Sequence, residues 1–485
     1  MTQSLPSDTA YEPVMGLEVH AELATDAKMF CGCSTRFGAP SNSQTCPVCL
    51  GLPGSLPVVN HKAVDYGLRA ALALGCEILN PCLFERKNYY YPDLPKNYQI
   101  SQKRRPLGRS GRLEIEVEGS SKLVGIDDVH LEEDTGKLLH PEGAGNHYSL
   151  VDYNRSGVPL LEIVGAPDLR SLKEVSAYMT AIRDLLLCLG VSDCRMEEGK
   201  LRFEANISLR PAGAEEYGAR VEIKNLNSFR TVLRCLEHEI ERQQQALRAG
   251  AEVARETRLW NEAACASAAM RSKEEAQDYR YFPEPDLVPL MIDARWLERA
   301  RAALPELPGA RRRRFVVELG LSPYDAGILA GQREVADYFE GVVAAGVEAK
   351  AAANWVAGEL LRHLNERGVA VAAAPVTPER LAELIKLVEQ GGVTTKAAKE
   401  VFAEMFASGR AAAEIVAERG LGQIRGQDEL AAVVERVIAD NPAAAGDLRG
   451  GKEQALKFLV GQVMKATRGR ADAQAVGALL RRRLE

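Results

Sequence analysis

The sequence predicts an α+β domain with a largely antiparallel sheet, followed by an all-α domain and a small helical tail. Residues 12–292 combine short alternating segments, such as 113–117, with Gly and Pro turns and few helical stretches. After Pro289, alanine becomes frequent, cysteine is absent beyond residue 265, and amphipathic helical patterns take over. A polar break at 420–427 separates a terminal segment. We therefore expect three domains, at 12–292, 293–424 and 425–485.

Length and composition indicate a globular protein with more than one domain. The 485 residues exceed what a single hydrophobic core supports, and 46% hydrophobic with 26% charged residues is the usual balance of a folded protein. The longest apolar runs are shorter than a membrane span, and residues 1–11 are polar, without the apolar core of a signal peptide. We expect a cytoplasmic protein with no membrane partner.

The distribution of charge points to the end of the chain. A formal net charge of −6 does not favour nucleic-acid binding by the chain as a whole, and we expect no DNA partner. Residues 451–485, however, hold eight Lys or Arg against three Asp or Glu. This local excess of five positive charges predicts a tail that contacts phosphates.

Separated carboxylates with one imidazole form the first chemical pattern. Glu18 and His20 are two residues apart in the segment 16–20, so on a strand both point to the same face. The segments 131–136 and 196–206 supply further acids. Such oxygen-rich sets suit Mg²⁺ and its nucleotide better than zinc. Acid runs are more often solvated faces, and a strand histidine is more often a satisfied core or surface residue, so both interpretations stay open on spacing alone.

The ten cysteines divide into a cluster and a scattered group. The cluster has the spacing C-x-C-x12-C-x2-C, which predicts a closed tetrahedral zinc site with a structural role; the alternative is four free cysteines. Its members are Cys31, Cys33, Cys46 and Cys49. The scattered six are expected to be small buried hydrophobes. They are Cys76, Cys82, Cys188, Cys194, Cys235 and Cys265.

The segment 84–102 is dense in tyrosine, cations and proline. Pro92 and Pro95 fix the backbone and remove two donors, so Lys87 and Lys96 are expected on stiff loop rather than in a long helix or a central strand. A buried core does not explain such a composition, so the segment is expected to form a polar functional surface. The alternative is an exposed tyrosine-rich loop without chemistry.

Helix signals are clear in the second half of the chain. Thr377-Pro378-Glu379 supplies an N-cap, a proline in the first helical position and an acid in the first turn. Apolar residues at helical spacing continue to Val388, and Gly391-Gly392 ends the pattern. A helix is predicted between these signals.

A phosphate-loop pattern near the end of the chain is rejected. Residues 446–452 fit G-x4-G-K, but Glu453 follows where a P-loop needs a hydroxyl for Mg²⁺. We interpret this segment as a loop before a helix over 454–465 and expect no nucleotide to bind there.

Four segments resemble, in the same order, blocks of the GatB/GatE family, whose bacterial members are components of glutamine-dependent tRNA amidotransferases. They are 84–102, 151–163, 221–230 and 270–287. The resemblance extends over nearly the whole chain. It implies a cradle-shaped catalytic domain related in fold to glutamine synthetase, with a zinc knuckle at 31–49, then a helical domain and a YqeY-like tail that binds tRNA.

The resemblance also implies roles for individual residues. Positions that bind Mg²⁺ in the family are occupied here by Glu18, His20, Glu132 and Glu133. Glu204 stands where the family usually has Asp, and Asn97 where glycine is usual. The family positions at the mouth of an ammonia tunnel are Lys87 and Lys96, and the positions expected to contact the tRNA backbone are Lys465, Arg468 and Arg470.

The implied activity is ATP-dependent conversion of misacylated Glu-tRNA(Gln), Asp-tRNA(Asn) or both to the correct amide, through an acyl phosphate. The implied partners, which form a heterotrimer with this chain, are an amidase that supplies ammonia from glutamine and a small third protein. The implied cofactors are ATP, Mg²⁺ and structural Zn²⁺. Two alternatives are a non-catalytic tRNA-binding adaptor and a freestanding glutamine-synthetase-like ligase. An adaptor needs no Mg²⁺ site, and the basic tail disfavours a ligase for a small metabolite.

Overall fold

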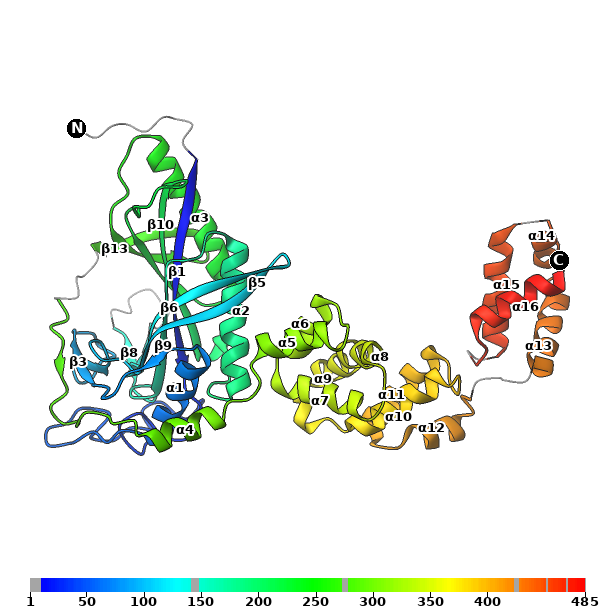
Figure 1. Ribbon diagram of the computed structural model, residues 1–485, viewed down its shortest axis with the longest axis horizontal. Coiled ribbons are helices and arrows are strands. Elements are labelled where there is room, and N and C mark those ends of the chain that lie inside the picture. The colour runs from blue at the N-terminus through cyan, green and yellow to red at the C-terminus, as the bar shows by residue number, and fades with distance from the viewer. Residues whose placement is uncertain are drawn as a thin grey trace. The chain divides into compact units, whose positions relative to one another are not determined.

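The computed structural model describes residues 10–140, 148–272, 278–422, 427–450, 452–467 and 470–484 (Figure 1). The chain forms two compact units, one up to residue 310 and one from residue 311 onward. The change from one unit to the other falls within α5 (Pro308–Val317). The first unit holds the sheet, and the second is helical.

The first unit is built on a nine-stranded sheet with the order β13-β12-β11-β10-β1-β9-β6-β5-β2. Every neighbouring pair is antiparallel apart from β11 and β12, which run parallel. The predicted α+β class with a largely antiparallel sheet is therefore confirmed. The strands are β1 (Tyr11–Glu22), β2 (Glu77–Ile78), β5 (Gly108–Val117), β6 (Ser120–Glu133), β9 (Pro159–Gly165), β10 (Leu201–Pro211), β11 (Val221–Leu226), β12 (Glu256–Asn261) and β13 (Ala266–Ser272).

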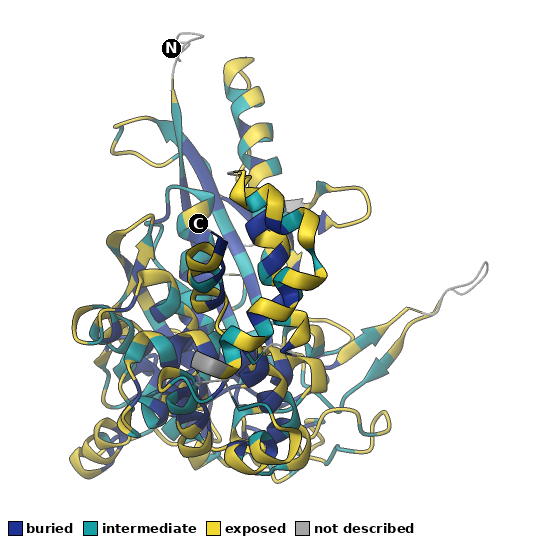
Figure 2. Ribbon diagram, turned by 90° about the vertical axis from the view of Figure 1, so that its right-hand side faces the viewer, coloured by how far each residue is buried: buried dark blue, intermediate teal, exposed yellow. Residues whose placement is uncertain are grey.

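Helices cover one face of this sheet. Contacts join α1 (His61–Ala73) to β5 and β6, α2 (Leu172–Leu189) to β5, and α3 (Phe229–Arg248) to β10 and β11. Along β1, the apolar side chains of Leu17, Val19 and Ala21 are buried, whereas Glu18 and His20 alternate with them. Figure 2 shows buried residues along the long strands. The polar side chains of β1 are thus left on the other face of the sheet.

Two smaller sheets complete the first unit. One has the order β14-β3-β4, formed by β14 (Phe282–Pro283), β3 (Glu85–Asn88) and β4 (Tyr98–Ser101), and the other pairs β7 (Lys137–Leu139) with β8 (Leu150–Asp152). Lys87 lies on β3, the middle strand of its sheet, so the expectation of a loop is wrong for this residue. The strand ends at Asn88, before the two prolines, and Lys96 lies beyond them outside any strand.

The first unit extends past the expected limit at 292. Trp296 and Ala300 of α4 (Ala294–Ala302) belong to the core of the sheet unit. The Trp296 ring stacks on His61 with ring centroids 4.2 Å apart, and its Nε1 donates to Asp65 Oδ1 over 3.1 Å. The composition changes at Pro289, but this apolar helix face is buried against α1, so composition alone put the limit too early.

The described part of the second unit has two separate hydrophobic cores, the first from Phe315 to Ile415 and the second from Val434 to Leu484. Helix α10 begins after the Thr377 N-cap and ends at Glu389, as predicted. Gly446 lies within α14, so most of the rejected phosphate-loop segment is helix rather than loop. The helices are α6 (Pro323–Ala330), α7 (Arg333–Ala344), α8 (Ala349–Asn354), η2 (Trp355–Leu360), α9 (Leu361–Arg367), η3 (Val371–Ala373), α10 (Pro378–Glu389), α11 (Thr395–Ser408), α12 (Ala412–Arg419), α13 (Gln427–Asp440), α14 (Pro442–Arg449), α15 (Glu453–Ala466) and α16 (Ala473–Leu484).

The scattered cysteines follow the expectation with one exception. Five of them are buried, but Cys265 is exposed. It lies in the turn between β12 and β13 with a positive φ of 49°, where the chain reverses at the surface. No helix among the described residues has the length and hydropathy of a membrane span.

Candidate functional site

A cleft of about 850 Å³ lies on the face of the main sheet that the helices leave uncovered. Strands β1, β6, β9, β10 and β11 supply its floor, and the Lys87–Tyr89 region supplies one side. Its charged lining includes both signs. The acidic members are Glu18, Asp128, Glu132, Asp134, Glu162, Glu204 and Glu222, and the basic members are Lys87, Lys103, Arg202, Arg220, Lys224 and Arg255, with His20 and His130 between them.

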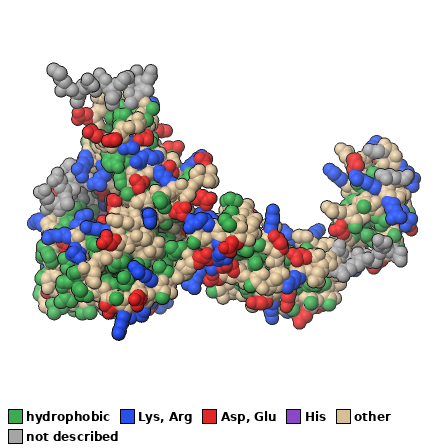
Figure 3. Space-filling model, viewed as in Figure 1, with side chains coloured by type: hydrophobic (Ala, Val, Ile, Leu, Met, Phe, Trp, Pro, Cys, Tyr) green, Lys and Arg blue, Asp and Glu red, His purple; other side chains and the backbone are tan. Residues whose placement is uncertain are grey.

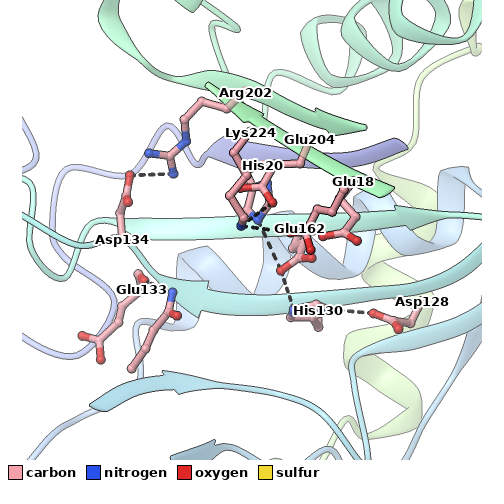
Figure 4. Close-up of polar contacts among 12 residues, drawn as sticks. Glu18, His20, Asp128, His130, Glu133, Asp134, Glu162, Arg202, Glu204 and Lys224 are labelled. Carbon is pink, nitrogen blue, oxygen red and sulfur yellow. Dashed lines mark hydrogen bonds and ion pairs between the residues drawn. The ribbon is translucent and has the colours of Figure 1, made fainter. Parts of the chain in front are cut away.

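The register of the sheet places three of these side chains in one row. His20 on β1 is opposite Glu162 on β9, and Glu162 is opposite His130 on β6. Directly opposed residues point to the same face. Glu162 Oε2 consequently lies 3.4 Å from His20 Nε2 and 3.0 Å from His130 Nε2 (Figure 4). Asp128 extends the row, since its Oδ1 is 2.7 Å from His130 Nδ1.

Opposite charges stabilise this row against the cost of burial. Burial disfavours the charged imidazole, but the Glu162 carboxylate outweighs it and raises the pKa of His20 to about 9. The pKa of His130 is likewise raised well above its usual value despite burial, because Glu162 and Asp128 face it. Burial also opposes ionisation of Glu162, yet the two imidazoles hold its pKa well below the usual range. Glu162 is therefore a carboxylate between two cations.

Glu132 completes a set that suits a divalent cation. Ligand atoms of His20, Glu132 and Glu162 all lie within 4.8 Å of one another. Glu132 is two residues from His130 on β6, which puts it on the same face, and burial together with Glu162 raises its pKa. A cation would relieve the repulsion between the two carboxylates. Binding of a cation would displace the proton of His20, because an imidazole that ligates a metal is neutral. Two carboxylates and one neutral imidazole leave room for water and phosphate oxygens, as Mg²⁺ requires, so the residues fit such an ion.

Glu18 and Glu204 line the same cleft beside this set. They are cross-strand partners on β1 and β10. Asn206 Nδ2 donates to Glu18 Oε1 over 2.8 Å. Burial raises the pKa of Glu18, and repulsion from the Glu162 carboxylate raises it further. Lys224 Nζ lies 2.7 Å from Glu204 Oε2 and 3.1 Å from Glu222 Oε1. Glu204 is thus already paired with a cation in the structure.

Glu133 does not belong to this group. It follows Glu132 on β6, and successive strand residues point to opposite faces. Its carboxylate forms an ion pair with Lys96 and accepts a hydrogen bond of 2.9 Å from Ile100 N. In Figure 4 the Glu133 carboxylate lies apart from the row of histidines. Of the five residues expected around Mg²⁺, four line the cleft, and Glu133 is turned away from them because side chains alternate along a strand.

The two lysines expected together lie in different cavities. Lys87 lines the large cleft, where its Nζ is 5.1 Å from the centroid of the Tyr279 ring and 5.8 Å from that of Tyr89. Burial disfavours its charge, but nearby tyrosines and the Glu132 and Glu162 carboxylates raise its pKa well above the usual value. Lys96 and Glu133 line a second cavity of about 150 Å³ next to the clustered cysteines.

The clustered cysteines come together as their spacing predicts. Sulfur atoms of all four lie within 4.8 Å of one another. Cys46 N donates to Cys49 Sγ over 3.2 Å, and a hydrogen bond with Cys31 lowers the pKa of Cys49 to about 4. Gly51 has a φ of 67°, and a Cβ there would meet Lys96 Cγ at 2.3 Å, so glycine is required at this close approach. Four converging thiols with a backbone N–H to sulfur fit a tetrahedral Zn²⁺ ion.

The basic tail is only partly engaged by acids. Lys465 is exposed on α15, and Arg470 Nε donates to the Thr467 carbonyl over 3.3 Å. Arg468 lies outside the described residues. Among the terminal arginines, Arg481 pairs with Glu453 at 2.9 Å and Arg483 with Glu435 at 3.2 Å. Figure 3 shows Lys and Arg mixed with Asp and Glu over the C-terminal part in that view.

Sequence reasoning missed Glu162, His130 and Arg202. Two features of the sequence could have indicated the first two. Glu162 is an acid inside the apolar run 158–164, and His130 lies two positions before Glu132, which puts both on the same face of a strand. Arg202 NH2 lies 2.9 Å from Asp134 Oδ2. Burial lowers the pKa of Arg202, but the attraction of the Asp134 carboxylate outweighs this effect, so the pKa is raised. Their assembly depends on strand register, which spacing along the chain does not give.

Comparison with known proteins identifies relatives over nearly the whole chain. Residues 13–298 match the model of the GatB/GatE catalytic domain, and residues 337–484 match that of the GatB domain. A protein of Moorella thermoacetica is 56% identical over 98% of this chain and 100% of its own length. Proteins of Carboxydothermus hydrogenoformans and Geobacter sulfurreducens are 55% and 51% identical, each over 98% of this chain and 99% of their own length. All three are named as the B subunit of aspartyl/glutamyl-tRNA(Asn/Gln) amidotransferase.

Proposed function

The chain belongs to the GatB/GatE family, and from this membership we propose that it catalyses the ATP-dependent amidation of misacylated Glu-tRNA(Gln), Asp-tRNA(Asn) or both. The observation that carries the proposal is the cleft in which His20, Glu132 and Glu162 converge among further acids and cations. Such a cleft suits a nucleotide and its divalent cation, which a purely structural protein does not need.

The chemistry requires activation of a carboxylate. A side-chain oxygen of the aminoacyl group attacks the γ-phosphorus of ATP, the bond to the bridging oxygen breaks, and ADP leaves. Ammonia then attacks the acyl carbon, phosphate departs and a proton is lost to give the amide. A divalent cation at the cleft would neutralise charge on the phosphoryl group during the first step. We propose His20, Glu132 and Glu162 as its ligands, with Glu18 and Glu204 beside them.

The remaining residues of the cleft would orient the substrates. Lys87, Arg202 and Lys224 provide cations that phosphate oxygens can approach, and the ring of Tyr279 lies beside Lys87. His130, through its contact with Glu162, would hold that carboxylate in position. In this proposal the chain itself supplies the binding geometry and the electrostatic field, while ATP supplies the leaving group.

Ammonia has to reach the acyl phosphate without protonation. We propose that it comes from a partner amidase, with a small third protein completing a heterotrimer, and that it enters past Lys96 and Lys87. Support comes from the cavity of Lys96 and Glu133, on the side of β6 away from the acids, and from the position of Lys87 in the cleft. Family membership and the relatives' names support the partners.

The other assignments concern zinc, tRNA and location. We propose that Cys31, Cys33, Cys46 and Cys49 hold a structural Zn²⁺ and that Lys465, Arg468 and Arg470 contact the tRNA backbone. The four converging sulfurs support the first, and the exposed position of Lys465 supports the second. We further propose a cytoplasmic location, where charged tRNA is made. No membrane or DNA partner is part of this proposal.

The test is an amidation assay of the reconstituted heterotrimer with both misacylated tRNAs. Glu162→Gln should remove amide formation, whereas glutamine hydrolysis by the partner persists because that reaction uses a separate site. The alternative, a non-catalytic tRNA-binding adaptor, predicts unchanged amidation in this variant. Wild-type rates of ATP-dependent amide formation by Glu162→Gln would therefore reject the proposed role of the cleft.

A further inference from the structure

Lys28 is a buried lysine whose ammonium group lies beside a thiol. Its exposed fraction is 0%. Its Nζ lies 3.5 Å from Cys49 Sγ and donates to the Tyr153 carbonyl over 3.3 Å. A lysine this deep is rare unless it is paired, because removing an ammonium from water is costly. Its anionic partner has to be found among the groups around it.

The available carboxylates do not provide that partner. No carboxylate of the described residues lies within ion-pair distance of Lys28 Nζ. The nearby Glu133 carboxylate already pairs with Lys96 and accepts from Ile100 N. The group in contact with Lys28 Nζ that becomes negatively charged on binding a metal is the Cys49 thiol.

We propose that Lys28 is the counter-cation of the four-cysteine metal centre and sets its affinity for zinc. A Zn²⁺ ion bound by four thiolates has a net charge of −2, and such a centre in a half-buried pocket needs positive charge or N–H donors at its sulfurs. Lys28 provides one full positive charge, and Cys46 N provides a hydrogen bond to the same Cys49 sulfur. This inference rests on the proposed zinc site and goes beyond the ligands themselves.

The backbone ties Lys28 to both halves of the cysteine set. Lys28 N donates to the Cys33 carbonyl over 2.9 Å, whereas its side chain reaches Cys49. Gly157 lies against both side chains: its φ of 89° favours glycine, and a Cβ there would be in van der Waals contact, at 3.4 Å, with Lys28 Cδ and Cys49 Cβ. The fold therefore fixes the position of the ammonium group beside the cysteines.

The experiment compares zinc release from the full-length wild type, Lys28→Met and the control Lys62→Met. Lys62 is exposed on α1 and pairs with exposed Asp26, so its charge is not needed inside the protein. Transfer of zinc to a chromophoric chelator should be roughly 10–100-fold more favourable for Lys28→Met, the range seen when a group supporting metal ligands is removed. Lys62→Met should behave as the wild type, and Lys28→Arg, which keeps the charge, should retain zinc better than Lys28→Met.

A second readout separates charge from packing. With zinc bound, Lys28→Met should unfold at a lower temperature than the wild type. After zinc removal, the destabilisation of the variant relative to the wild type should be smaller, because the ammonium then faces at most one thiolate instead of a zinc centre with a net charge of −2. If Lys28→Met does not fold, Lys28→Gln replaces it in both measurements.

Equal zinc release by Lys28→Met and the wild type, or equal destabilisation with and without zinc, would overturn the inference. Metal analysis of the wild type distinguishes this from failure of the zinc site. A wild-type protein that binds no zinc rejects the site and the inference together, whereas bound zinc with unchanged release in the variant rejects the role of Lys28 alone.

Discussion

Nε2 of His130 lies 3.0 Å from Oε2 of Glu162, on the neighbouring strand of the sheet. The other ring nitrogen of His130 is 2.7 Å from Asp128 Oδ1, so the imidazole is fixed at both ends. Since Glu162 also contacts His20, this arrangement fixes the direction in which the carboxylate can approach a cation. His130 is therefore a positioning residue in the proposed site.

Replacing His130 by Gln should weaken binding of the divalent cation by roughly 10–100-fold, the usual cost of losing a partner of a metal ligand. The amidation rate should recover when Mg²⁺ is raised, and Mn²⁺ titration of the full chain should show the weaker affinity directly. His140→Gln is the matched control, because His140 is exposed and contacts Ser149 instead. An unchanged Mg²⁺ requirement in His130→Gln would contradict the positioning role.

Glu132→Gln and Glu133→Gln should have different consequences although the residues are adjacent. Glu132→Gln removes a proposed ligand and should reduce both cation binding and amide formation. Glu133→Gln should leave cation binding in the cleft intact. It leaves the buried ammonium of Lys96 without its carboxylate partner, however, so it should lower the free energy of unfolding by about 3–5 kcal/mol. Mn²⁺ titration and urea unfolding of both variants check this. Equal loss of cation affinity in the two variants would refute the separation.

The cysteine cluster makes a prediction that needs no enzyme assay. Cys49→Ser should lose bound Zn²⁺ and unfold at a lower temperature, whereas Cys265→Ser should keep zinc, since Cys265 is exposed on a turn away from the cluster. X-ray absorption of the wild type should give Zn–S distances of about 2.3 Å. Freely titratable thiols at all four positions of a zinc-free wild type would rule out the site.

His363 should make the helical unit less stable in acid. Burial lowers the pKa of His363, and the positive charge of the adjacent Arg362 lowers it further. The Nε2 atom of His363 accepts a hydrogen bond from Arg362 NH2 over 3.1 Å. The unfolded chain therefore binds a proton more readily than the folded one, so this contribution is present above a pH of about 6.5 and is lost as the pH falls. In His363→Leu, the decline of the unfolding temperature between about pH 7 and pH 5 should be shallower. An identical pH profile would show that His363 does not contribute.

Sequence patterns correctly predicted the features that depend on neighbouring residues, such as helix limits and the face of a strand on which a side chain lies. The Thr377 cap and the following apolar spacing were sufficient for α10, and alternation correctly put Glu18 and His20 on one face of β1. Applied to β6, the same alternation separates Glu132 from Glu133. Glu162 could not be assigned from spacing, because it meets His20 only through the placement of β9 between β1 and β6. Likewise, the change in composition after Pro289 did not reveal that Trp296 packs on His61.

Removal of residues 425–485 should weaken tRNA binding and leave the cleft intact. Within the described residues, this tail has its own hydrophobic core and supplies none of the residues that line the cleft. The tRNA KM should therefore rise much more than kcat at saturation falls, and the salt dependence of tRNA affinity should become less steep because fewer phosphates are neutralised.

The point variants sharpen this test of the tail. Lys465→Ala and Arg470→Ala should each reduce the slope of log Kd against log salt by about one, whereas the control Lys350→Ala, exposed on α8, should not change it. Filter binding at several salt concentrations measures the slope without catalysis. Because the expected loss is electrostatic, it should be largest at low salt and shrink as salt rises, which a loss of folding would not do. Unchanged affinity and slope in the truncated protein would reassign the tail to assembly or regulation.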